Sequence, residues 1–168
     1  MKRIVVFILA LCLCVGLCAC SKSSEETSET TEEVLLTAEN FYDYFIVEKS
    51  VEDFSTEPCS FDMAGLCYDA TANVVVSIDK RSEFEIENVS VTFEVGMHEE
   101  SISSTDWTEE TITIEIPVSG HQKKSVSLET NEPIIDYSMK GDISKPIAKI
   151  TIKSISGSII VKKTSEQE

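Results

Sequence analysis

Basic residues are scarce in this chain, which has 14 Lys and Arg against 30 Asp and Glu among 168 residues and a formal net charge of −16. A surface of this sign repels the phosphate backbone of nucleic acids and anionic polymers. It attracts cations and basic partners only loosely. The composition therefore predicts a well-hydrated exterior and no nucleic-acid function.

Histidine and glycine are also rare, and their positions exclude common catalytic motifs. The two histidines, His98 and His121, lie in polar segments without the helical HExxH context of a metalloprotease. The six glycines are scattered, so neither a GxSxG elbow nor a Gly-rich phosphate loop occurs. We predict no catalytic residue, no cofactor and no metal centre. Calcium near Asp62 and Asp69 stays an open alternative, although an EF-hand pattern is missing.

The amino-terminal segment is typical of an export signal. Lys2 and Arg3 form a short positive region, and an uncharged apolar run follows from Ile4 to Cys20. A transmembrane helix needs about 20 apolar residues, and this run falls slightly short and has no basic stop-transfer residues after it. Ordinary secretory cleavage favours a small residue three positions before the cut, where Leu17 would stand.

The stretch LCAC, which ends at Cys20, resembles a bacterial lipobox, the Leu-x-small-Cys pattern at which the cysteine is lipidated and becomes the mature amino terminus. A thiolate is the nucleophile that takes up the diacylglyceryl group, and the small Ala19 lets the peptidase approach. The resemblance implies that residues 1–19 are a lipoprotein signal peptide and that Cys20 is the lipidation site. An uncleaved signal anchor is the alternative.

A lipid on Cys20 would hold the protein on the extracytoplasmic face of the bacterial cell membrane. Two acyl chains suffice for stable anchoring, because each buried methylene contributes about 0.8 kcal/mol. Loss of Lys2 and Arg3 would change the charge to 12 minus 30, or −18. Ser21–Glu33 has no apolar residue, so residues 20–33 are predicted to be the lipidated cysteine and a disordered acidic tether.

Residues 34–168 suffice for a single domain with its own core. In LTAENFYDYF, Thr37 is a candidate N-cap, and Phe41, Tyr44 and Phe45 share one face at helical spacing. We expect one short helix that leads into a strand near residues 45–49.

Further along, the apolar period changes from helical spacing to two, which predicts half-buried strands. Phe84 and Ile86 have the opposite parity to the apolar residues that follow them, so a bulge near Glu87-Asn88 is needed to keep one buried face. Turn signals are expected at residues 79–82, 119–120 and 156–157, and further strands at 125–129, 148–152 and 158–161. The expected inward positions are Val74, Val76 and Ile78 in one strand and Ile112, Ile114, Ile116 and Val118 in another.

Short strands without amphipathic helices between them predict an all-β fold. We expect an immunoglobulin-like antiparallel sandwich of about seven or eight strands with one short N-terminal helix, and a small barrel is the second choice. LTAENFYDYF, NVSVTFEV and KSISGSIIV together resemble segments of small lipoproteins of Gram-positive bacteria, most of them of unknown function. That resemblance implies an immunoglobulin-like domain and implies no activity.

Only Cys59 and Cys67 remain once the signal peptide and the lipidated cysteine are set aside. An exported compartment permits a disulfide between them, which would stabilise by about 2 to 3 kcal/mol. Free thiols are the alternative.

Two functions from different classes stay open. One is a binding or adaptor module whose loops or strand edge contact an unidentified envelope protein. The other is a structural or accessory envelope lipoprotein without a ligand site. Trp107 is expected in the core, as large aromatic residues usually are. The candidate contact residues are Phe61, Met63, Leu66 and Tyr68 in one segment and Ile134, Ile135 and Tyr137 in another.

Overall fold

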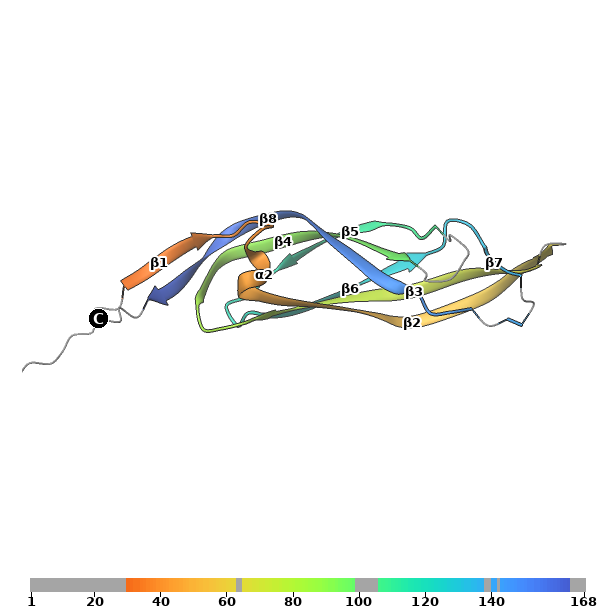
Figure 1. Ribbon diagram of the computed structural model, residues 1–168, viewed down its shortest axis with the longest axis horizontal. Coiled ribbons are helices and arrows are strands. Elements are labelled where there is room, and N and C mark those ends of the chain that lie inside the picture. The colour runs from red at the N-terminus through yellow and green to blue at the C-terminus, as the bar shows by residue number, and fades with distance from the viewer. Residues whose placement is uncertain (1–29, 63–64, 99–105, 138–139, 142, 164–168) are drawn as a thin grey trace, which may run out of the picture. The chain divides into compact units, whose positions relative to one another are not determined.

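The computed structural model describes residues 30–62, 65–98, 106–137, 140–141 and 143–163, and residues 31–162 form one compact unit (Figure 1). None of the described helices has the length and apolar character needed to span a membrane. The elements are β1 (Thr30–Leu35), α2 (Phe41–Tyr44), β2 (Phe45–Asp62), β3 (Gly65–Lys80), β4 (Glu85–His98), β5 (Glu110–Glu115), β6 (His121–Glu129), β7 (Ile134–Asp136) and β8 (Ile147–Lys163).

The strands form two antiparallel sheets, which confirms the predicted sandwich. The first sheet has the order β1-β8-β4-β5, and the second has the order β2-β3-β6, with β7 also paired to β3. The chain makes the hairpin β2-β3, crosses to the hairpin β4-β5, returns to β6 and β7 beside β3, and crosses again to β8 beside β4. Such crossings between two packed sheets are typical of antiparallel β-sandwiches. β1 runs opposite to β8 at the outer edge of the first sheet (Figure 1).

The core forms where the inward faces of both sheets meet. On β3 the predicted inward residues Val74, Val76 and Ile78 are all fully buried. On β4 the buried set changes parity as predicted, from Phe84 and Ile86 to odd-numbered residues. The odd-numbered members are Val89, Val91, Phe93 and Val95.

A bulge causes that change of parity, at the predicted position. The register shifts between Glu87 and Ser90 of β4, and Asn88 has a φ of 51°. On β8 a single residue, Gly157, lies opposite the two residues Asn88 and Val89 of β4 and has a φ of 102°. A Cβ atom at Gly157 would lie 2.5 Å from the carbonyl oxygen of Asn88. Only glycine allows the two backbones to approach this closely.

Several expected extents were wrong, each for a local reason. The tether expected over residues 20–33 ends earlier, because Thr30–Leu35 form β1 at the edge of the first sheet. The strand expected at 125–129 is longer, because β6 begins at His121 and pairs with β3 from Asp79 onward.

β8 is one strand, because Gly157 accommodates the bulge of β4 and does not end the strand. β2 continues to Asp62, because it stays paired to β3 across two register shifts. Val118 is 75% exposed, because β5 ends at Glu115 and the chain then enters a turn at Pro117.

The predicted helix exists but is a single turn. The backbone N–H of Asn40 donates to the Thr37 hydroxyl at 3.3 Å, and the N–H of Thr37 donates to the Asn40 side-chain oxygen at 2.7 Å, so these two residues close the turn that precedes α2. The N-cap of α2 is Asn40, which makes no side-chain cap hydrogen bond, so the expected N-cap at Thr37 was wrong. Phe41 and Phe45 are fully buried, with their rings stacked at 4.8 Å between centroids. These two rings fix α2 to the core.

We expect Gly157→Ala to lower the free energy of unfolding by about 2 to 4 kcal/mol, because the new Cβ atom meets backbone in a left-handed conformation. Gly96→Ala is the matched control, since its nearest neighbour, Cγ of Glu109 at 3.3 Å, is on a flexible side chain. Urea unfolding followed by the fluorescence of Trp107 measures both. Equal stability of Gly157→Ala and the wild type would contradict the role assigned to the bulge.

Candidate functional site

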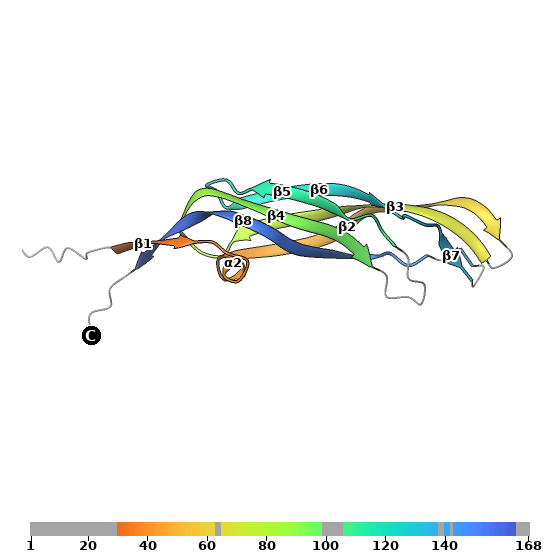
Figure 2. The same cartoon turned by 90° about the horizontal axis from the view of Figure 1, so that it is seen from above.

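β5 and β6 lie on the side of the domain opposite α2 in the view of Figure 2. β5 is the edge strand of the first sheet, and β6 is an edge strand of the second. Just after β5, the backbone N–H of Ile116 donates to the Val89 carbonyl of β4 at 2.8 Å. A turn closed by the N–H of Gly120 and the carbonyl of Pro117 then leads to β6.

A depression follows this side, and we call it the edge groove. It is defined by residues 86–90 of β4, residues 113–118 of β5 and the following turn, and residues 122–124 of β6. Two adjoining hollows of about 820 and about 400 Å³ share Glu115 and Gln122.

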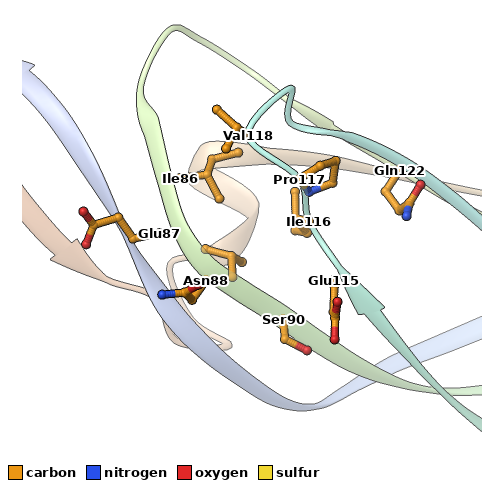
Figure 3. A pocket seen from close by; sticks show the side chains of 10 residues that line it. Ile86, Glu87, Asn88, Ser90, Glu115, Ile116, Pro117, Val118 and Gln122 are labelled. Atoms are coloured by element: carbon orange, nitrogen blue, oxygen red, sulfur yellow. The ribbon is translucent and has the colours of Figure 1, made fainter.

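The edge groove has an apolar floor and a polar rim. Ile86, Ile114 and Ile116 are buried beneath it, whereas Val118 is exposed at its end. In Figure 3 the side chains of Ile86, Ile116 and Val118 gather beside the turn. Those of the paired residues Ser90 and Glu115 point together in another direction. Such a surface suits an extended peptide, whose apolar side chains can contact the floor while its polar backbone contacts the rim.

The groove exists because the apolar pattern of β6 ends halfway along the strand. Leu128 pairs with Ala72 and is buried, but Lys124 pairs with Val76 and Gln122 pairs with Ile78. Lys124 and Gln122 therefore stand on the inward face of β6 at positions where a closed sandwich would bury apolar residues. The Lys124 ammonium donates to the carbonyl oxygen of Thr113 on β5 at 2.9 Å. One polar contact thus links the two sheets at this point.

The contact residues proposed from sequence lie elsewhere, where β2, β3 and β7 pair. The structure brings the two segments together, since Leu66 pairs with Asp136 and Tyr68 pairs with Ile134. Ile134 is only 3% exposed, so it is a core residue and not a surface contact. The adjacent Ile135 is half-buried, as are Leu66 and Tyr68, while Tyr137 is 68% exposed.

Phe61 and Met63 are the remaining two contact residues proposed from sequence. Phe61 lies in β2 opposite Leu66, and nothing further is described of its side chain. Met63 lies outside the described residues. Sequence patterns did not identify the edge groove, although Gln122 and Lys124 in HQKKSVSL, at positions where apolar inward residues are expected, were the available signal.

The chemical groups proposed from sequence also have defined positions. Trp107 is 5% exposed and forms a bridge to Thr130, which confirms it as a core residue. His121 is exposed, with its Nδ1 2.6 Å from Oδ1 of Asp79, and His98 is exposed at the end of β4. In the described part of the chain, no three His, Cys, Asp or Glu residues are grouped to hold a metal ion.

Cys59 and Cys67 lie in the neighbouring strands β2 and β3, at the register shift between Pro58 and Ser60. Cys59 is exposed and Cys67 is buried, and no disulfide joins them in the structure. The pairing of adjacent strands brings the two backbones close, so the disulfide stays a prediction about the oxidised protein.

Comparisons with protein-family models, with curated proteins and with solved structures gave no match to this chain. No functional residue is therefore transferred from another protein. The function proposed below depends on the residues of this chain.

We expect the exported protein to contain the Cys59–Cys67 disulfide, which non-reducing peptide mass spectrometry detects as one crosslinked peptide pair. A loop this short should add about 2 to 3 kcal/mol to the free energy of unfolding, and Cys67→Ser should remove it. Cys59→Ser should show the same loss, because either substitution prevents the same bond. Full alkylation of both thiols without a reductant would contradict the prediction.

Proposed function

We propose that this protein is a lipid-anchored binding or adaptor module on the extracytoplasmic face of a bacterial cell membrane, without catalysis. Cys20 carries the lipid, and residues 21–29 hold the domain away from the membrane, because residues 30–33 belong to β1. The domain binds a protein of the cell envelope whose identity is open. The support is the lipobox-like LCAC, the acidic stretch after it and the edge groove.

The edge groove is the observation that carries the binding role. A sandwich that serves only as a spacer gains stability from burying apolar residues at every inward position of its strands. This chain instead has Lys124 and Gln122 at two such positions of β6 and leaves Val118 75% exposed beside them. Concave surfaces with an apolar floor and a few convergent polar groups are the usual form of binding sites.

A structural or accessory envelope lipoprotein is the second candidate. It is favoured by the distribution of the large exposed apolar residues, which occur on separate elements and do not form one broad patch typical of permanent interfaces. In the described chain these residues are Leu35, Tyr42, Ile46, Val118, Tyr137 and Ile147.

The anchor has a direct test. We expect Cys20→Ala to abolish lipidation, so that the protein is released or remains as an unprocessed precursor. Cys18→Ala is the matched control, because it leaves the nucleophile and the small residue before the cut in place. Intact-mass analysis of the membrane fraction distinguishes the outcomes. An unchanged membrane-bound mature mass in Cys20→Ala would rule out the proposed anchor.

The binding role has a separate test in intact cells. A photoreactive amino acid at position 118 should crosslink the anchored protein to one stoichiometric protein partner, because Val118 projects from the edge groove. The same amino acid at position 147, where Ile147 is exposed on β8, is the control and should give background only. A background result at both positions would favour the accessory role.

A further inference from the structure

We propose that the partner binds through an extended acidic segment, which adds as a strand to the free edge of β6 beside the edge groove. This inference rests on the proposed binding function, and it names the site within the groove and the chemistry of the partner. Four features of β6 carry it: its unpaired backbone, its regularity, its charge and its inward face.

The register shows which backbone groups of β6 are unpaired. The carbonyl of Gly120 accepts from the N–H of Lys80, so even-numbered residues direct their backbone groups towards β3 and odd-numbered ones direct theirs away. Glu129, at the end of β6, uses this outer side to exchange hydrogen bonds with Thr108.

The other odd-numbered residues of β6 present their backbone groups to solvent. Within the described ranges one contact reaches them, from the N–H of Lys123 to the side-chain oxygen of the adjacent Gln122 at 3.3 Å. They form a ladder of donors and acceptors that suits an added strand. Its members are His121, Lys123, Ser125 and Ser127.

The edge strands β5 and β2 have features that oppose pairing with an added strand. On β5, the carbonyl of Thr113 is already bonded to Lys124, and Pro117 follows the strand closely. On β2, Pro58 lacks a donor, and Asp53 has a φ of 49° where the register shifts. β6 pairs with β3 over nine residues without a register shift and contains no proline. Its edge is therefore a more regular template than the edges of β5 and β2.

Charge selects an acidic occupant for this edge. The sequence His121-Gln122-Lys123-Lys124 puts two lysines on adjacent positions, one on each face of β6, in a chain of net charge −16. Lys123 lies 3.5 Å from Oε1 of Glu52, and both side chains are about half exposed, so this ion pair is weak and can exchange partners. The outward face of an added strand passes the Lys123 ammonium, so acidic side chains are favoured there and basic ones are repelled.

The groove also restricts the residues that alternate with the acidic ones. Side chains on the inward face of an added strand enter the gap above Ile114 and Ile116, next to the half-buried Val126 of β6. Small or β-branched apolar side chains fit this floor. The partner segment therefore has carboxylates at alternate positions of a stretch about six residues long.

The test uses the full lipidated chain in neutral detergent and two labelled ten-residue peptides. One peptide alternates Glu with Val and Thr, and the other has Lys in place of every Glu. Fluorescence anisotropy should show binding of the acidic peptide, weakened by added salt, and none of the basic peptide. Hydrogen exchange should show new protection at Lys123, Ser125 and Ser127. Equal binding of both peptides would overturn the proposal.

Two variants separate charge from strand pairing. Lys123→Glu with Lys124→Glu should weaken binding by about tenfold or more. Ser125→Pro should weaken it as much, because it removes an outward donor, and it should leave the unfolding midpoint nearly unchanged because no bond to β3 is lost. Lys145→Glu with Lys149→Glu, a matched change at two exposed lysines, should stay within about twofold of the wild type. Full binding by Ser125→Pro would refute strand addition.

The remaining outcomes are also informative. A concentration-dependent dimer that Ser125→Pro abolishes would show that the edge serves a second copy of this chain, and it would overturn the acidic-partner proposal. If crosslinking at position 118 finds a partner but the acidic peptide does not bind, this inference fails and the proposed function stands. If neither experiment gives a signal, both fail.

Discussion

The structure depends on keeping one apolar face continuous along unusually long strands. β2, β3, β4 and β8 have 18, 16, 14 and 17 residues, and a slip of one residue would turn every following side chain to the opposite face. Bulges restore the register where the apolar pattern changes parity. Asn88 does so on β4, and a second shift between Thr92 and Phe93 keeps Ile155 and Ile152 of β8 both directed inward.

The same constraint explains where the sandwich opens. Inward positions of β6 are apolar at Leu128 and Val126 and then polar at Lys124 and Gln122, so apolar packing cannot continue to the end of the strand. β5 ends at Glu115 and pairs with β4 only from Ser90 onward. Ile86, Ile114 and Ile116 of the first sheet are still buried, but Val118 beyond them is 75% exposed, and the edge groove lies along this end. The site is thus a consequence of how the core ends.

The net negative charge of the domain is compatible with the binding of an acidic segment at β6. A high negative charge keeps the domain hydrated and disfavours non-specific association with anionic surfaces. The lysines of β6 are a local exception, and Lys123 is held only by a half-exposed ion pair. A charged edge strand also resists aggregation, because an unmatched strand must approach two ammonium groups. The same lysines can protect the free edge and select its occupant.

The sequence by itself determined the fold class, because alternation of apolar residues with a period of two is a local property. It also located the bulge at Asn88, since Ile86 and Val89 cannot face the same core without one extra residue. It misjudged Gly157, which resembles a turn signal until the bulge of β4 is placed opposite it. Only the tertiary structure decided that β5 and β6 flank one groove and that Lys124 reaches Thr113, because these contacts join different sheets and depend on where each strand ends.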